Sequence, residues 1–172
     1  MKHKVTLIPG DGIGPEVALA AKRCIEATGV SIEWEEFLAG EGAIKKFGTP
    51  LPDEILQSIR NNKVALKGPI VTPIASGFRS VNVAMRHALE LFACVRPAQS
   101  IEGVTNCAHT NVDIVIIREN SEDLYAGIEF EKGTNNTKQL IALINKLSTN
   151  KVRTDSGISI KPISEFASRR IV

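Results

Sequence analysis

The chain has 172 residues, of which 43% are hydrophobic and 23% charged, and its formal net charge is +2. This length is enough to bury a hydrophobic core, and the composition is typical of a soluble globular protein. The small net charge and the 5% aromatic content argue against a nucleic-acid-binding surface. No apolar run is long enough to span a membrane, and the N-terminus lacks the apolar core of a signal peptide. We therefore expect a cytoplasmic protein that binds neither nucleic acid nor membrane.

The cysteines point to the same compartment. Cys24, Cys94 and Cys107 are odd in number and have neither CxxC nor metal-ligand spacing. They are predicted to be reduced and mostly buried thiols.

Hydrophobic periodicity predicts strands and helices that alternate in the first half of the chain. An apolar strand at residues 5–8 leads through a glycine-rich turn at 9–14 into a helix that begins at Pro15. The core-facing positions of this helix are predicted to be Val17, Ala20, Ala21, Cys24 and Ile25. A strand at 32–37, a helix at 51–60 and a strand at 64–66 follow, which indicates an α/β fold with some parallel pairing.

A further helix is expected after Ser80. Its predicted core-facing positions are Val81, Ala84, Met85, Ala88, Leu89 and Phe92. The strand at 113–117 is almost entirely apolar, as expected when both faces of a sheet are covered. A helix within 133–147, a strand at 158–160 and a helix capped by Ser164 complete the pattern. No C-cap closes that last helix before residue 172, which we take as a sign that the chain stops within an element.

Polar and basic side chains gather at the start of the helix after Ser80. Ser80 is a natural N-cap, and Asn82 and Arg86 lie four residues apart on a face away from the apolar positions. Arg79 and Arg96 add two more guanidinium groups. A helix N-terminus favours an anion, and arginine binds carboxylates in bidentate fashion, so the pattern indicates a small acid with several negative charges. A serine cap on a solvated helix face has the same spacing and is the alternative.

Three loops follow the carboxyl ends of predicted strands, where ligands bind in open α/β sheets. In the first loop the glycines at 10, 12 and 14 match a dinucleotide fingerprint only weakly, since proline occupies the place of its third glycine. A tight turn explains these glycines equally well. The second loop, residues 67–73, leads towards the helix that carries the arginines or serves as scaffolding.

The third loop follows Arg118, which leaves an apolar strand and is costly there unless an anion meets it. The acidic residues Glu119, Glu122 and Asp123 are expected to pair with arginines. Tyr125, the single tyrosine, is a candidate general acid, although a lone tyrosine at a loop end is more often a packing residue.

Five stretches together resemble one family, the β-decarboxylating dehydrogenases that include isocitrate and 3-isopropylmalate dehydrogenases. They are residues 8–16, 66–69, 79–86, 91–97 and 118–129, so the resemblance spans most of the chain. Residues 79–86 are similar to the isocitrate branch, and residues 157–165 are similar to the clasp-bearing bacterial enzymes.

The resemblance implies an α/β fold of the isocitrate/isopropylmalate dehydrogenase type, distinct from the Rossmann fold and incomplete at the C-terminus. Residues 1–94 would form the N-terminal part of the large domain. Residues 95–172 would form part of the small domain, with a clasp-like segment at about 126–163. We expect the partial chain to leave an apolar face uncovered.

The resemblance also implies the roles of particular residues. Tyr125 would be the catalytic acid, and Val71 and Thr72 would contact the nicotinamide end of the cofactor. The carboxylates and the hydroxyl of isocitrate would be bound by Ser80, Asn82, Arg86, Arg96 and Arg118.

The implied reaction is oxidative decarboxylation of isocitrate to 2-oxoglutarate by a homodimer, with NADP or NAD and with Mg²⁺ or Mn²⁺. Family members are about twice this length. Their general-base lysine, metal-binding aspartates and adenosine-binding loop are expected after residue 172, so no metal ligand is assigned here. We expect the 172-residue chain to be inactive on its own. Two alternatives stay open: a sister enzyme for isopropylmalate or homoisocitrate, and a non-catalytic substrate-binding subunit.

Overall fold

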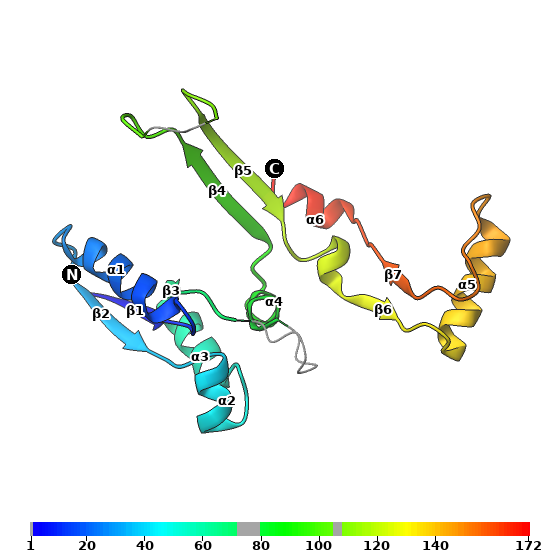
Figure 1. The fold of residues 1–172 in the computed structure, drawn as a ribbon, viewed down its shortest axis with the longest axis horizontal. Coiled ribbons are helices and arrows are strands. Elements are labelled where there is room, and N and C mark those ends of the chain that lie inside the picture. Colours follow the sequence, from blue (N-terminus) through cyan, green and yellow to red (C-terminus); the bar gives the residue numbers. More distant parts are fainter. Residues whose placement is uncertain (1, 72–79, 105–107) are drawn as a thin grey trace. The chain divides into compact units, whose positions relative to one another are not determined.

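The computed structural model describes residues 2–71, 80–104 and 108–172. The chain forms two compact units, Met1–Glu90 and Leu91–Val172, and each is described by itself (Figure 1). Three residues that the sequence singles out, Thr72, Arg79 and Cys107, lie outside the described residues.

The first unit is a parallel sheet with helices. Its elements are β1 (His3–Ile8), α1 (Gly14–Glu26), β2 (Ile32–Glu36), α2 (Glu41–Phe47), α3 (Asp53–Asn62), β3 (Ala65–Lys67) and α4 (Val81–Ala88). The sheet has the order β2-β1-β3, and both pairings are parallel. Val5 of β1 lies opposite Trp34, and Leu7 lies opposite both Glu36 and Leu66. The predicted strand and helix alternation with parallel pairing is confirmed.

The hydrophobic core of this unit joins β1, α3 and α4. It consists of Ile8, Ala39, Ile55, Leu56, Ile70, Val81 and Met85. Two of the predicted core positions of α4, Val81 and Met85, are buried, but Ala84 is exposed. Phe92 does not belong to α4 at all, because the helix ends at Ala88 and its C-cap is Leu89.

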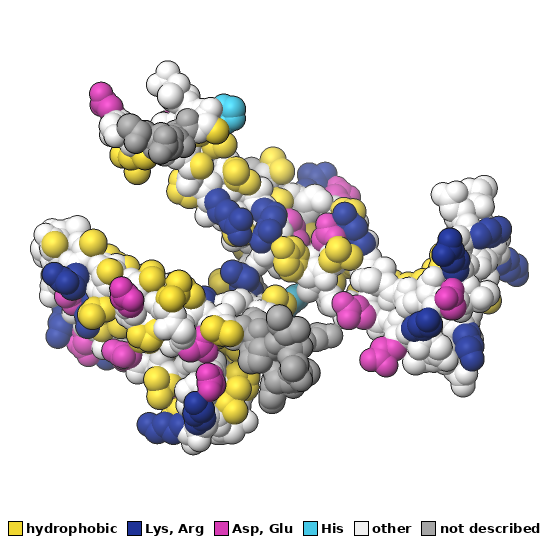
Figure 2. Space-filling view, viewed as in Figure 1, with side chains coloured by type: hydrophobic (Ala, Val, Ile, Leu, Met, Phe, Trp, Pro, Cys, Tyr) yellow, Lys and Arg dark blue, Asp and Glu magenta, His cyan; other side chains and the backbone are white. Residues whose placement is uncertain are grey.

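The prediction of which α1 residues face the core is wrong in part. Gly14 and Ala18 are its buried residues, whereas Val17 is 48% exposed and Cys24 is also exposed. Gly14 is buried because it lies against the backbone carbonyl groups of the neighbouring loops, which rotates the side with Val17 and Cys24 away from the core. Figure 2 shows hydrophobic side chains on the surface of this unit. The expectation that the cysteines are mostly buried therefore fails at Cys24, while Cys94 is half-buried.

The second unit contains two antiparallel strand pairs. Its elements are β4 (Ala93–Gln99), β5 (Asp113–Glu119), the 3-10 helix η1 (Asp123–Ala126), β6 (Ile128–Phe130), α5 (Asn135–Leu147), β7 (Ile158–Ile160) and α6 (Glu165–Arg169). β4 pairs with β5, and β6 pairs with β7 (Figure 1). The predicted cap Ser164 of α6 is confirmed, since its side chain accepts a hydrogen bond from a backbone amide, and Thr134 caps α5 in the same way.

The expectation that both faces of the strand at 113–117 are covered is wrong for the described residues. Ile114, Val115, Ile116 and Ile117 are 51%, 59%, 52% and 51% exposed. Successive strand residues point to opposite faces, so both faces of β5 present apolar side chains to solvent. The uncovered apolar surface that the sequence predicts is therefore present. No described helix is long and apolar enough to cross a membrane.

A small polar network lies beneath the sheet of the first unit. The hydroxyl groups of Thr6 and Ser58 are 2.7 Å apart, and these residues are only 0% and 6% exposed. The Glu35 carboxylate accepts from Ser58 Oγ at 2.9 Å and from Asn62 Nδ2 at 2.8 Å. These hydrogen bonds, together with that from Lys4, lower the pKa of Glu35. The network ties α3 to both β1 and β2.

We expect Ser58→Ala to destabilise the protein by about 1–3 kcal/mol, because it leaves the buried Thr6 hydroxyl with fewer partners. Urea unfolding followed by the fluorescence of Trp34, the single tryptophan, measures this. Gln57→Ala, one residue earlier on the exposed side of α3, is the matched control and should change stability by less than about 0.5 kcal/mol. Equal effects of the two substitutions would contradict a stabilising network.

Candidate functional site

The loops after β1 and β3 pack against each other through their backbones. A Cβ atom on Gly10 would lie 1.8 Å from the Pro69 carbonyl oxygen, and one on Gly68 would lie 2.0 Å from the Pro9 carbonyl oxygen. Gly10 also has a φ of +83°. Only glycine fits at these positions. The glycines after β1 therefore serve a tight turn and a close approach of two loops, which accounts for the weak match to a dinucleotide fingerprint.

Asp11 fixes these loops at the carboxyl edge of the sheet. Its carboxylate accepts from the backbone amide of Val71 at 2.5 Å and from that of Glu41 at 3.1 Å, and its own amide donates to Pro69 at 3.1 Å. Asp11 thereby holds Val71, a predicted cofactor residue, in an exposed position after β3. Sequence reasoning missed this aspartate, although an acidic residue between turn glycines after a strand is a signal for such a role.

α4 carries three predicted site residues. Ser80 occupies the N-cap position as predicted, but its side chain makes no capping hydrogen bond. Asn82 Oδ1 is buried and has no hydrogen-bond partner within the described chain. Arg86 is half-buried, and no described carboxylate pairs with it. The start of α4 thus holds a hydroxyl, an amide and a guanidinium group that are available to a ligand.

A second positive charge lies near Arg86. Burial of Lys67 lowers its pKa, the positive charge of Arg86 lowers it further, and the Asp11 carboxylate acts in the opposite direction. The Lys67 Nζ donates to the Gly68 carbonyl at 2.7 Å. Lys67 and Arg86 give this edge of the first unit a positive potential that suits an anion.

The remaining predicted residues belong to the second unit. Arg96 lies on β4 opposite Ile116 and is exposed, and Arg118 lies on β5 opposite Cys94. The guanidinium carbon of Arg118 is 5.1 Å from the centroid of the Tyr125 ring. The structure therefore brings Arg118 and Tyr125 together within this unit, whereas Ser80, Asn82 and Arg86 are described within the first.

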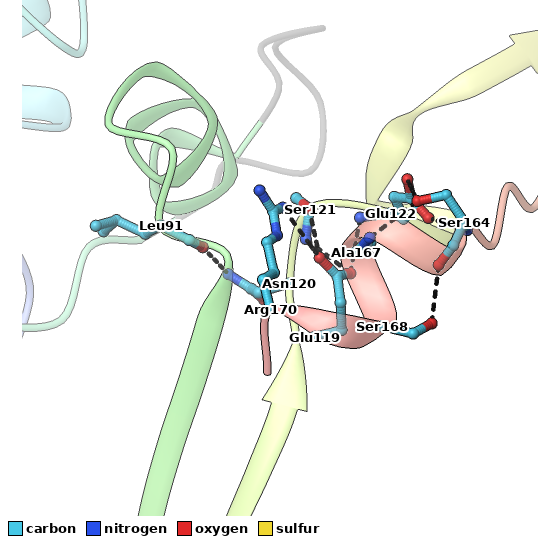
Figure 3. Close-up of polar contacts among 9 residues, drawn as sticks. All are labelled: Leu91, Glu119, Asn120, Ser121, Glu122, Ser164, Ala167, Ser168 and Arg170. Atoms are coloured by element: carbon cyan, nitrogen blue, oxygen red, sulfur yellow. Dashed lines mark hydrogen bonds and ion pairs between the residues drawn. The ribbon is translucent and has the colours of Figure 1, made fainter. Parts of the chain in front are cut away.

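Arg118 does not pair with the acidic residues that follow it. Its Nη2 donates to Asn120 Oδ1 at 3.4 Å, and its Nε is buried without a partner. Glu119 instead pairs with Arg170, the C-cap of α6, and Glu122 accepts from Ser164, its N-cap, so the expected pairing with arginines is confirmed for Glu119 and wrong for Glu122 (Figure 3). Asp123 pairs with Lys161 at 3.0 Å. Arg118 is thus a half-buried cation without a described carboxylate partner.

The Glu119 carboxylate is the centre of the cluster in Figure 3. Oε1 and Oε2 each accept from the backbone amide of Ser121 at 2.9 Å, Oε2 accepts from the amide of Glu122 at 2.8 Å, and Ser121 Oγ donates to Oε1. Arg170 adds an ion pair at 3.5 Å. Burial of the carboxyl group alone would raise its pKa. The hydrogen bonds from Ser121, Glu122 and Arg170 outweigh burial and lower the pKa of Glu119 from 4.5 to about 2.

Arg170 is a residue whose importance sequence reasoning missed. It contacts Glu119 across 51 positions of sequence, and no short-range pattern signals such a pair.

Among the described residues no group of three or more histidine, cysteine, aspartate or glutamate side chains could hold a metal ion.

The first unit is thus a parallel α/β unit with glycine-tied loops, and each unit holds a half-buried arginine, Arg86 or Arg118, that no described carboxylate pairs with. The sequence matches the isocitrate/isopropylmalate dehydrogenase family over residues 4–172, and the chain belongs to this family. The predicted family and fold type are confirmed.

Two relatives illustrate the similarity. The isocitrate dehydrogenase [NADP] of Archaeoglobus fulgidus is 46% identical over 169 residues, which cover 95% of this chain and 41% of the relative. That of Staphylococcus epidermidis is 43% identical over 180 residues, which cover 98% of this chain and 43% of the relative. The chain thus spans less than half the length of the relatives that it matches.

Two solved structures of dehydrogenases are also similar to this chain. The isocitrate dehydrogenase of Methylococcus capsulatus superimposes with a TM-score of 0.80 at 47% identity, covering 98% of this chain and 45% of that one. A β-decarboxylating dehydrogenase from Thermococcus kodakarensis superimposes with a TM-score of 0.67 at 27% identity, covering 98% and 43%.

We expect Glu119 to make stability depend on pH. Its pKa is lower in the folded chain than the usual 4.5, so its contribution is complete above about pH 4.5 and is lost as the pH falls towards 2. Glu119→Gln should therefore destabilise the protein near pH 7 and much less near pH 2. Urea unfolding of both proteins across this range tests the prediction, and parallel stability curves would contradict it.

Proposed function

We propose that this chain carries the substrate clamp and the catalytic acid of an isocitrate dehydrogenase, which converts isocitrate to 2-oxoglutarate with NADP. The observation that carries the proposal is the pairing of Arg118 with Tyr125, in which a half-buried guanidinium group that no described carboxylate pairs with lies over the single tyrosine ring of the chain. A cation and a proton donor side by side suit a reaction on an acidic substrate. The NADP-dependent relatives support the substrate and the cofactor.

The clamp is proposed to consist of Ser80, Asn82, Arg86, Arg96 and Arg118. Its three guanidinium groups balance the three carboxylates of isocitrate. The buried, unpartnered Oδ1 of Asn82 provides an acceptor for the substrate hydroxyl, which is a donor. In this proposal residues 1–94 and 95–172 belong to the large and small domains of a homodimer subunit.

Tyr125 is proposed to protonate the enol that remains after carbon dioxide leaves. Its hydroxyl donates the proton to carbon, and the nearby guanidinium group of Arg118 stabilises the negative charge that the oxygen then carries. NADP supplies the hydride acceptor, and Val71 and Thr72 are proposed to contact its nicotinamide end. Val71 fits this role because Asp11 holds it exposed at the carboxyl end of β3, where nucleotide ligands bind in α/β sheets.

The arginine clamp is tested in a chimera in which residues 1–172 replace the matching segment of the Methylococcus capsulatus enzyme. We expect activity with isocitrate and NADP. Arg86→Ala or Arg96→Ala should lower kcat/KM at least ~100-fold, because an unpaired substrate carboxylate costs about 2–5 kcal/mol. Arg169→Ala, which removes an exposed guanidinium group from α6, is the control.

Losses below about threefold for both clamp variants would contradict the clamp. Turnover of isopropylmalate or homoisocitrate in preference to isocitrate would favour a sister enzyme. A chimera that binds isocitrate but does not turn it over would favour a non-catalytic subunit.

The role of Tyr125 is tested by Tyr125→Phe in the same chimera. We expect kcat to fall by about 10²–10⁴-fold, the usual contribution of a general acid, with little change in KM. The phenylalanine keeps the ring beneath Arg118, so a loss of activity reports the missing hydroxyl. An unchanged kcat would show that Tyr125 is a packing residue.

A further inference from the structure

The segment between Arg118 and Tyr125 begins with a turn that is closed by the side chain of Glu119, its first residue. The Glu119 carboxylate accepts the backbone amides of Ser121 and Glu122, so it closes a tight turn directly after β5. The Asn120 amide donates to the Phe92 carbonyl at 2.8 Å, and its side chain donates to Leu91 at 3.4 Å. This turn sets the spacing between the end of β5 and η1.

α6 holds this turn at two points (Figure 3). The Glu122 carboxylate accepts from the amide of Ser164 at 2.6 Å and from its hydroxyl at 2.7 Å. Ser164 in turn caps α6 by accepting from the amide of Ala167 at 3.0 Å. At the other end of the helix Arg170 donates to Ser121 Oγ and pairs with Glu119. The helix therefore contacts the turn at both of its ends.

The orientation of Arg170 is fixed by more than its charge. Its guanidinium carbon is 4.6 Å from the Phe92 ring centroid and 5.0 Å from that of Phe166. A partly exposed ion pair at 3.5 Å contributes little stability by itself. Two ring faces and two acceptors instead hold the planar group in one orientation, which an ammonium group on a flexible chain does not reproduce.

We propose that Arg170 is a positioning residue that keeps the guanidinium group of Arg118 over the ring of Tyr125. Arg170 contacts Glu119 and Ser121 of the turn and acts through them. The catalytic consequence rests on the proposed function, but the geometric claim does not. Loss of the Arg170 guanidinium group releases the turn and increases the separation of Arg118 and Tyr125.

The single tyrosine makes this measurable in the 172-residue chain without substrate. Carbon-13 labelling of tyrosine gives one set of ring signals, and all of them belong to Tyr125. Arg118→Met removes the cation from the ring and defines the signal position of an uncovered Tyr125. We expect Arg170→Met to move the ring signals towards that position by more than the line width, and Arg170→Lys to lie between Arg170→Met and the unmodified chain.

Arg169→Met is the matched control. It removes the guanidinium group of the neighbouring residue, whose side chain is 77% exposed and pairs with Glu165 alone among the described residues. This variant should leave the Tyr125 signals in place. Should Arg170→Met fail to fold by circular dichroism, Ser121→Ala, which removes one acceptor of Arg170, is expected to shift the signals in the same direction.

The proposal is overturned when Arg118→Met moves the signals but the folded Arg170 and Ser121 variants do not. It is also overturned when Arg118→Met has no effect, because the ring is then not covered. The Arg86, Arg96 and Tyr125 variants of the chimera test the proposed function separately. Unchanged activity in those variants contradicts the proposed function and leaves the positioning result unaffected.

Discussion

The close approach of the loops after β1 and β3 is the constraint on which the first unit depends. Two backbone segments meet where any side chain on Gly10 or Gly68 would overlap a carbonyl oxygen. This contact brings Val71 within reach of the Asp11 carboxylate and sets the path that the chain takes after β3. The Asp11 carboxylate also satisfies two backbone donors, the amides of Val71 and Glu41, that no other described backbone group accepts. The turn after β5 follows the same principle, with Glu119 in place of Asp11.

The elements were predictable from sequence because their signals are local. The strand at 3–8, the parallel pairing and the cap at Ser164 follow from apolar runs and from capping chemistry within a few residues. Burial was less predictable, since it depends on what covers a face. The apolar pattern of Val17 and of Ile114–Ile117 indicates contact surfaces, and the described residues do not cover them.

The candidate site could be proposed from the sequence for a different reason. The residues around Ser80 and Arg118 form contiguous stretches that resemble a family, and a contiguous stretch is visible without any knowledge of the fold. Asp11 and Arg170 act through contacts across 60 and 51 positions of sequence, respectively. No periodicity or spacing rule links residues so far apart. The structure is needed to find such supporting residues.

The half-buried arginines differ in their described hydrogen-bond and ion-pair partners, a difference that the sequence alone does not show. Three described arginines are half-buried, Arg86, Arg118 and Arg170. Removing a guanidinium group from water is costly unless a carboxylate or another acceptor compensates, and only Arg170 has a described carboxylate partner. Arg118 and Arg170 each keep a buried Nε without a described acceptor, but the other described partners of Arg118 are only an amide oxygen and the face of a ring. Arg170 therefore belongs to the described scaffold of the second unit, whereas Arg86 and Arg118, each within its own unit, keep a charge that no described carboxylate balances.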